Sequence, residues 1–557
     1  MNEDKTNDIP SALIRAAAEA TADPNMTVEE ALARLPGDPG AVYEEAVIHA
    51  LKTIRQKDEA NYARLVAKAK GCKSRLDKLT APERSDSHDN KQDVVLGIVQ
   101  KYCRLGHDLD GKGIAVVERD DCRQVWLLES QGFKDWLRSV IYQEHRTGIT
   151  DQALDTVIAT LKAIAQHEGE LMTVHVRCAK QGDAYFLDRG ADDWSAIRVD
   201  KDGWAVTSRP RAFLTRTANM RPLPEAPLQG DLKKLWNHVN VPEHYQLPLL
   251  AWLLDSLRPD TPYPILELTG EQGSAKSSTQ RRLRSLIDPN KVPLRGRPKT
   301  VEDIYVSAAN SYVVSFENLS HLTPEQQDAL CTLSTGGGFA TRQFYTNGEE
   351  HVLETKRPVI FNGINPVATQ PDLIERTISI ELPTISSDER RDEQTLELEW
   401  ESDYPVILTG LLELFAKTLA KLPSVNLKAK QRMADYQMLG EAMAQQLGHP
   451  DGQFSRQYEQ IIGEGVERGL ETYGIVNALQ VFMSGQRQWA GTYLVLLGEL
   501  SSTPGVDRSH WPRSPRALSG QLKRLAPGLR RVGLEIEALG HGRAGSQVKI
   551  INRTPTA

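Results

Sequence analysis

Residues 264–278 read PILELTGEQGSAKSS, and this stretch decides the fold class of the chain. An apolar run from Ile265 to Leu268 meets a glycine-bearing loop, which leads directly into a segment of helical character. The loop follows the P-loop pattern G-x-x-x-x-G-K-[ST], with alanine in the second fixed glycine position. The residues predicted to hold a nucleotide are Gly270, Glu271, Gln272, Gly273, Ser274, Ala275, Lys276, Ser277 and Ser278.

The order strand, loop, helix suits a nucleoside triphosphate. Successive backbone N–H groups point into such a loop, and the dipole of the following helix also favours an anion. Lys276 is expected to contact the β- and γ-phosphates, and Ser277 to ligate Mg²⁺. The alternative is an ordinary glycine turn before a helix, but the flanking strand and helix favour ATP binding. Ala275 fits the loop if its φ is negative, because a position with φ above zero favours glycine.

Composition places the chain among soluble globular proteins. Its 557 residues correspond to about three or four domains, and 40% are hydrophobic and 25% charged. No apolar run is long enough for a membrane span, and the N-terminus lacks a secretory signal, so a cytoplasmic protein is expected. The five cysteines are scattered without a C-x-x-C pair, which argues against a zinc ribbon or a disulfide framework.

The charge is unevenly distributed. The whole chain has a net charge of −7, yet residues 508–553 carry ten Lys or Arg against two Glu. A basic terminal segment on an acidic body indicates a localised contact with a polyanion such as DNA.

The sequence divides into five parts. We expect a helical region over 1–90, an α+β domain over 94–224, an α/β ATPase core over 231–384, a helical domain over 385–485 and a basic domain over 486–557. The polar segment 82–93 is predicted to be a linker. The segment HDLDGKG (107–113) superficially resembles a metal loop, but it lacks the later ligands of a calcium loop, and a solvated turn is the favoured interpretation.

A second part of the ATP site is predicted about 40 residues after the P-loop. In SYVVSFENLS (311–320) a buried-strand pattern ends at Glu317, which could hold Mg²⁺ through water as a Walker B acid. The next residue is Asn318, where many such ATPases have a second acid. Asparagine can orient a water but cannot accept its proton, so hydrolysis is expected to be slow or to use another base.

Two further catalytic residues are predicted downstream. Asn347-Gly348 indicates a β-hairpin with arms near 340–346 and 350–356. The strand RPVIF then ends at Asn362, which is suited to sensing the γ-phosphate or the attacking water. Arg376 precedes the strand TISIELP and is either an arginine finger for a neighbouring subunit or a member of a surface ion pair.

The order P-loop, Mg²⁺ acid, hairpin, sensor asparagine and arginine resembles the superfamily 3 helicases, a ring-forming branch of the AAA+ ATPases. The tract 336–366 is similar to the primase-helicases of poxviruses and phages, and GEQGSAKSS, LCTLSTGGGFATRQFYT and RPVIFNGI resemble ATP-binding proteins of phages and integrative elements. The resemblance implies a role in the DNA replication of a mobile element, with priming by a separate partner because no primase motif is visible. The matching positions of this tract are Gly336, Gly337, Arg342, Lys356 and Asn362.

The C-terminal part is predicted to be a winged helix. GTYLVLLGELSS and SPRALSGQLKRLAPGLRRVG read as helices, and LEIEALGHGRAGSQVKII as two strands around a glycine-rich loop. We expect the second helix to dock on duplex DNA through Arg516, Lys523 and Arg524, with Arg342 and Lys356 contacting single-stranded DNA in a ring pore. A helical cap with a solvated basic face, or a protein-binding winged helix, are the alternatives.

The favoured function is therefore an ATP- and Mg²⁺-dependent DNA helicase or translocase of a phage or mobile element, acting as a homo-oligomeric ring. The competing hypothesis is a DNA-binding ATPase switch, regulatory or part of phage defence, which binds ATP and recruits partners without unwinding. Asn318 and the acidic hairpin tip NGEE favour the switch.

Overall fold

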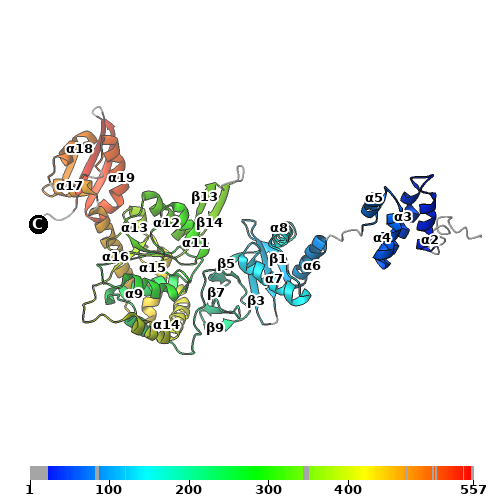
Figure 1. The fold of residues 1–557 in the computed structure, drawn as a ribbon. Helices are drawn as coiled ribbons and strands as arrows, with labels where there is room; N and C mark the ends of the chain where they lie inside the picture. The colour runs from blue at the N-terminus through cyan, green and yellow to red at the C-terminus, as the bar shows by residue number, and fades with distance from the viewer. Residues whose placement is uncertain are drawn as a thin grey trace, which may run out of the picture. The chain divides into compact units, whose positions relative to one another are not determined.

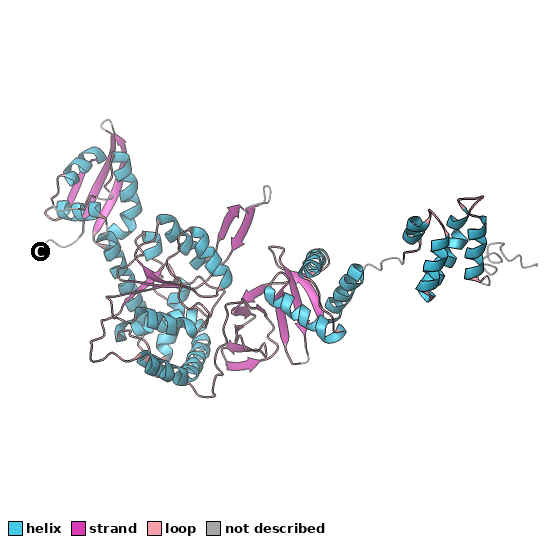
Figure 2. Cartoon of the chain, viewed as in Figure 1, coloured by secondary structure: helices cyan, strands magenta, loops and turns pink. Residues whose placement is uncertain are grey.

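A computed structural model describes residues 23–81, 87–119, 121–342, 350–471, 473–504, 507–508, 511–542 and 545–553. The chain divides into two compact units, one of residues 1–99 with 141–157 and one of 100–140 with 158–557. Each unit is described by itself. Figures 1 and 2 show the helices and strands.

The described part of the N-terminal unit is helical. It contains α2 (Pro24–Arg34), α3 (Glu45–Lys57), α4 (Glu59–Lys68) and α5 (Lys73–Leu79), and α6 (Ser87–Tyr102) follows. Val47, Leu51 and Ile54 lie on one side of α3 and pack with Leu65 of α4 in a small apolar core. The start of α6 at Ser87 corrects the expectation of a linker over 82–93, because a polar composition is shared by linkers and by exposed helical turns.

The region predicted to be α+β forms one mixed sheet, with both parallel and antiparallel pairs, and one antiparallel sheet. The six-stranded sheet has the order β4-β1-β2-β3-β10-β5 and the four-stranded sheet the order β6-β7-β8-β9. Asp200 pairs with Gly203 at the tight turn between β8 and β9. The bounds are β1 (Cys103–His107), β2 (Gly113–Glu118), β3 (Arg123–Leu127), α7 (Gln131–His145), α8 (Asp151–His167), β4 (Glu170–Leu171), β5 (Val174–Val176), β6 (Cys178–Gln181), β7 (Ala184–Asp188), β8 (Ala196–Asp200), β9 (Gly203–Thr207) and β10 (Phe213–Thr215).

The centre of the larger unit is a parallel sheet of order β12-β15-β11-β16. Its strands are β11 (Ile265–Thr269), β12 (Val314–Leu319), β15 (Val359–Gly363) and β16 (Thr377–Glu381). They are almost continuously buried, as expected for a parallel sheet covered on both faces. An isolated parallel bridge between Arg295 and Phe316 extends this sheet beside β12.

Helices and a hairpin surround this sheet. The helices are α9 (Glu243–Asp255), α10 (Lys276–Ser285), α11 (Val301–Asn310), α12 (Pro324–Thr335) and α13 (Pro371–Ile374), and the predicted hairpin has the arms β13 (Gly338–Arg342) and β14 (Glu350–Glu354). Figure 1 shows this hairpin projecting from the body of the core. Its predicted Asn347-Gly348 tip lies outside the described residues. The predicted helical domain consists of α14 (Glu393–Lys421), α15 (Ala434–Gln446) and α16 (Gln453–Glu471).

The C-terminal part combines helices with a three-stranded antiparallel sheet. Its elements follow the order α17 (Gly474–Met483), β17 (Gln488–Thr492), α18 (Tyr493–Ser501), α19 (Pro515–Arg531), β18 (Leu534–Gly542) and β19 (Gly545–Asn552). The strand order is β17-β19-β18. Ser514 caps α19 by accepting a hydrogen bond from Ala517 N, and Leu518, Leu522, Leu525 and Leu529 bury one side of this helix.

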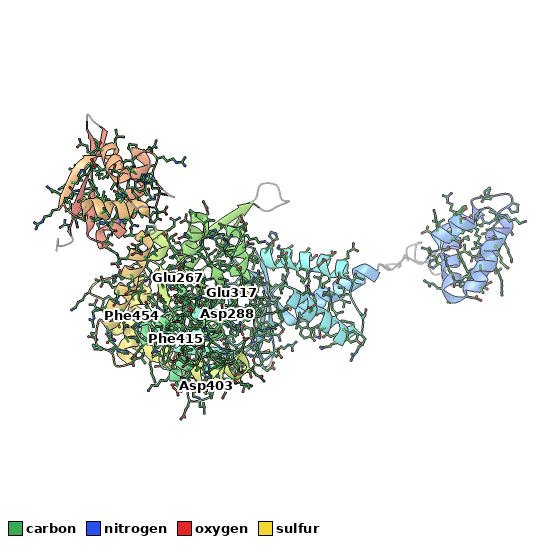
Figure 3. The ribbon with its side chains drawn as sticks, turned by 60° about the vertical axis from the view of Figure 1, so that its left-hand side comes forward. Glu267, Asp288, Glu317, Asp403, Phe415 and Phe454 are labelled. Carbon is green, nitrogen blue, oxygen red and sulfur yellow. The ribbon has the colours of Figure 1, made fainter. Side chains whose placement is uncertain are left out.

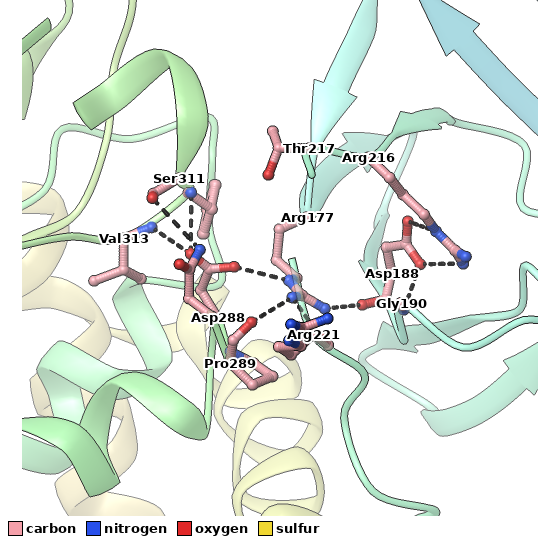
Figure 4. A network of polar contacts seen from close by, with 12 residues as sticks. Arg177, Asp188, Gly190, Arg216, Thr217, Arg221, Asp288, Pro289, Ser311 and Val313 are labelled. Carbon is pink, nitrogen blue, oxygen red and sulfur yellow. Dashed lines mark hydrogen bonds and ion pairs between the residues drawn. The ribbon is translucent and has the colours of Figure 1, made fainter. Parts of the chain in front are cut away.

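A buried polar network attaches the β6–β10 region to the core around the parallel sheet (Figure 4). The Arg177 guanidinium, fully buried, pairs with Asp288 at 3.1 Å and donates to the carbonyl of Pro289 at 3.1 Å. The other carboxylate oxygen of Asp288 accepts the backbone N–H groups of Tyr312 and Val313, both at 3.1 Å. Because Asp288 follows α10 and Tyr312 precedes β12, one carboxylate joins three parts of the fold.

Candidate functional site

The predicted phosphate loop connects β11 to α10, as the motif requires. Gly270 and Gly273 have φ values of 141° and 86°, which favour glycine. A Cβ on Gly270 would lie 2.5 Å from the carbonyl oxygen of Leu382, so this position also needs glycine for space. Ala275, however, has φ 57° and ψ 29°, a left-handed conformation. The condition under which Ala275 fits the loop without strain, a negative φ, is therefore not met, and its backbone has a conformation that glycine adopts at lower cost.

Lys276 begins α10 and folds back over the loop. Its Nζ donates to the carbonyl oxygens of Gly270 at 2.8 Å and Glu271 at 2.7 Å. Partial burial lowers the pKa of the Lys276 ammonium group. The ammonium group thus lies on the loop itself, close to where an anion bound by the loop N–H groups would sit.

The predicted Mg²⁺ ligands lie next to each other. Ser277 Oγ donates to Glu317 Oε2 at 3.2 Å, and both side chains are half-buried. A hydroxyl and a carboxylate are oxygen ligands of the kind that Mg²⁺ prefers, so these residues fit the ion. Figure 3 labels Glu317 in the core together with Glu267, a buried carboxyl on β11. Burial raises the pKa of Glu267, whose Oε1 accepts the N–H groups of Val367 and Ala368.

Asn362, the predicted sensor, lies at the end of β15 and is fully buried. Its Oδ1 accepts the backbone N–H of Asn318 at 2.9 Å, and its Nδ2 donates to Gln280 Oε1 at 2.6 Å. Asn318 has φ 54° at an irregularity in β12, and its side chain is exposed. Asn362 therefore contacts the residue after Glu317 through the backbone N–H of Asn318, while Asn318 itself is exposed.

Three residues at this site were not predicted. Gln280 of α10 is fully buried and connects this helix to β12 and β15. Its Nε2 donates to Ser315 Oγ in β12 at 2.8 Å, and its Oε1 accepts from Asn362 in β15. Asn240 Nδ2 donates to the carbonyl oxygens of Ser274 at 3.0 Å and Pro383 at 2.7 Å. Arg390 approaches Gly273 from the segment after β16. The sequence does contain a signal for Gln280, a polar residue at helical spacing from buried Leu283 and Ile287.

Arg376 lies away from the phosphate loop of its own chain. It immediately precedes β16, whose first residue Thr377 pairs with Ile265 at the start of β11, whereas the loop follows the end of β11. Its guanidinium forms an ion pair with Asp372, and its side chain is 12% exposed. Both alternatives predicted for Arg376 thus stay open, since a residue at this edge could reach only the nucleotide of another subunit.

The predicted DNA-contacting residues lie in two regions. Arg342 pairs through its backbone with Glu350 in the hairpin, and its side chain is outside the described part of the structure. Lys356 is half-buried near the ring of Tyr263, and burial lowers the pKa of its ammonium group. Both residues belong to the hairpin or its return into β15.

The other three basic residues lie on α19. Arg516, Lys523 and Arg524 are all exposed. Arg524 also lines a cleft of about 1210 Å³, together with residues of α12, α13 and the segments before them. Arg516 and Lys523 do not line the cleft. An extended polyanion could therefore reach these two basic side chains of α19 without entering the cleft.

Among the described residues, no group of three or more His, Cys, Asp and Glu side chains is arranged to hold a metal ion. In the same part of the chain, no helix has the length and apolar character needed to span a membrane.

Two stretches of the chain match family models. Residues 231–449 match the model described as "Actinomycete integrative conjugative element replication protein", and residues 475–557 match the one described as "AICE RepA C-terminal domain". A search of curated proteins finds no match. The chain thus carries both matched regions of a mobile-element replication protein.

Solved structures also resemble the chain at low similarity. One is described as "SCCmec type IV Cch - active helicase", with 11% identity, coverage of 81% of this chain and 93% of that chain, and a TM-score of 0.41. Another is "The A form apo structure of NrS-1 C terminal region-CTR", with 11% identity, coverage of 83% and 98%, and a TM-score of 0.36.

Proposed function

We propose that this chain, whose two matched regions are those of an integrative-element replication protein, is an ATPase that translocates on or unwinds DNA during replication of a mobile element. The observation that carries the proposal is the 3.2 Å contact between Ser277 Oγ and Glu317 Oε2. A P-loop hydroxyl and a strand-end carboxylate in contact are the protein groups that hold Mg²⁺ beside a triphosphate. When bound, the ion neutralises charge on the phosphates.

Each remaining residue has a role in this proposal. Lys276 holds the β- and γ-phosphates, and Asn362 orients the γ-phosphate or the attacking water. Arg376 acts on the ATP of the next subunit in a ring. The strand order β12-β15-β11-β16, with the loop after β11 and the acid on β12, supports an AAA+-like core of the superfamily 3 kind.

DNA is proposed to contact two surfaces. The projecting β13–β14 hairpin, with Arg342 and Lys356, contacts a single strand in the ring pore. The C-terminal part binds duplex DNA as a winged helix, through Arg516, Lys523 and Arg524. The chain order of its helices and strands, with the sheet order β17-β19-β18, supports this assignment, because α19 then takes the place of the groove-docking helix.

The test is strand displacement on forked DNA with ATP turnover measured in the same reaction. Wild-type protein should displace the strand while turning over ATP, and Lys276→Ala should do neither, because it loses a charge-assisted phosphate contact. Lys291→Ala, which removes an exposed lysine elsewhere in the core, is the control and should behave as wild type. Wild-type turnover by Lys276→Ala would show that the P-loop assignment is wrong.

A second experiment tests the duplex contact. Replacing Arg516 and Lys523 by alanine should weaken duplex binding and reduce the salt dependence, since each lost phosphate contact removes about 0.9 from the slope of log K against log salt. Replacing Lys428 and Lys430, two exposed lysines in the loop before α15, changes the charge equally and should have little effect. Equal effects of the two double variants would assign the duplex contact to another surface.

One observation favours the ATPase switch as a second candidate. Asn318 occupies the position of a second acid, and its side chain is exposed at the end of β12. Slow or stoichiometric ATP use without strand displacement, in the assay above, would support the switch and contradict the helicase.

A further inference from the structure

The segment between β16 and α14 forms a strap across the phosphate loop. It begins at Leu382, whose N–H donates to Thr269 O at 2.9 Å. Farther along, Ile385 N donates to the carbonyl oxygen of Gly273 at 3.2 Å. Asn240 connects the strap to the loop, because its Nδ2 donates to Ser274 O in the loop and to Pro383 O in the strap. The first part of the strap, residues 382–385, is therefore bonded to the end of β11 and to the loop.

Local hydrogen bonds fix the end of the strap. Ser386 Oγ donates to Glu389 Oε2 at 2.6 Å, and the N–H of Glu389 donates to Ser386 O at 3.2 Å, which forms a turn just before Arg390. Asp392 then caps α14 by accepting from Thr395 N at 2.8 Å. Arg390 thus lies between a closed turn and a helix cap, and its backbone position is determined by both.

The Arg390 side chain lies against the loop. Its Nη2 is 2.8 Å from the position that a Cβ on Gly273 would occupy. Its Nε donates to Ile385 O at 3.4 Å, and among the described residues no carboxylate forms an ion pair with it. The side chain is exposed, so most of its donors face solvent at the rim of the loop.

We propose that Arg390 contacts the phosphates of the bound nucleotide from the same subunit, as a second cation beside Lys276. This inference rests on the proposed ATP site. A guanidinium offers paired donors that match phosphate oxygens, and the N–H groups of the loop already favour an anion there. Arg390 differs in this respect from Arg376, which precedes β16 and could act only on a neighbouring subunit.

The next residue provides a matched control. Arg391 has the same chemistry and is also exposed, but its guanidinium pairs with Glu399 on α14. Arg391→Ala removes the same charge from the same strap without removing the group at Gly273.

The experiment is a titration of the full-length protein with a fluorescent ATP analogue and Mg²⁺, with thermal melting to verify folding. Arg390→Ala should weaken affinity about ten- to a hundredfold, the value of one charge-assisted hydrogen bond. Arg390→Lys should give an intermediate affinity, and Arg391→Ala should bind as wild type. The defect should persist at protein concentrations too low for subunit assembly, since the contact lies within one chain.

The outcomes separate the two proposals. If wild type binds ATP, Lys276→Ala does not, and Arg390→Ala binds as wild type, the role of Arg390 is overturned and the ATP site stands. Equal losses in Arg390→Ala and Arg391→Ala would also overturn it, because they would show a general effect of charge on the strap. If wild type itself binds no ATP, the proposed function fails and the inference fails with it.

Discussion

Replacing Ala275 by glycine should stabilise the protein. Ala275 has φ 57° and ψ 29°, and an L-residue in this left-handed region costs roughly 1–2 kcal/mol. Glycine removes that cost but loses more backbone entropy on folding, by roughly 0.5–1 kcal/mol. The methyl group is half-buried, so its removal costs little. The net expectation is a gain of about 0.5–1 kcal/mol in the free energy of unfolding of the core around the parallel sheet, from the difference of these two effects.

Urea denaturation monitored by tryptophan fluorescence measures this gain, as a higher midpoint with an unchanged slope. Ala309→Gly, at an exposed position of α11, is the matched control. The same substitution in a right-handed helix should destabilise by roughly 0.5–1 kcal/mol, so the two variants are expected to shift in opposite directions. A midpoint for Ala275→Gly at or below that of wild type would refute the argument that the loop holds Ala275 under strain.

Three further substitutions test other parts of the site. Asn362→Ala leaves Gln280 Oε1 buried without its donor, so the free energy of unfolding measured by urea denaturation should fall by about 1–3 kcal/mol. The variant should still bind ATP but release no phosphate from it. Phosphate release at the wild-type rate would contradict a sensor role for Asn362. Arg376→Ala should bind ATP but lose hydrolysis and poison wild-type protein in mixtures, whereas normal hydrolysis would reduce Arg376 to its ion pair with Asp372. Burial raises the pKa of Glu267 above its ordinary 4.5, so the native state holds this proton more tightly than the unfolded state, and stability falls as pH rises from about 4.5 through the raised pKa. Glu267→Gln should flatten this part of the curve of stability against pH. An unchanged curve would show that Glu267 is not the group responsible for this pH dependence.

The sequence predicts those parts of the site that depend on local pattern. The P-loop is a contiguous motif between a strand and a helix, and Glu317 and Asn362 each end an apolar strand. Parallel strands place their carboxyl ends at one edge of a sheet, so both residues lie near the loop after β11, where Glu317 contacts Ser277 and Asn362 contacts the backbone N–H of Asn318.

The site residues that the sequence analysis did not predict are placed there by contacts between segments distant in the sequence. Asn240 reaches Ser274 and Pro383, which lie 34 and 143 positions away, so no local pattern relates them. Arg390 lies in a charged stretch that reads as an ordinary solvated surface. The φ of Ala275 was left open by the sequence, because an alanine does not reveal the backbone conformation imposed on it by the loop.

The buried Arg177–Asp288 ion pair limits how the parts of this chain can be recombined during evolution. The region matched by the replication-protein model begins at residue 231, so Arg177 lies outside it while Asp288 lies inside. Removing one partner of a buried ion pair typically costs about 3–5 kcal/mol, a penalty that Arg284, 3.5 Å from Asp288, partly offsets. A recombination event at this boundary would therefore leave the new protein less stable unless residue 288 changed as well. We expect the β6–β10 region and the core around the parallel sheet to be inherited as one piece, and relatives that lack Arg177 to carry an uncharged residue in place of Asp288.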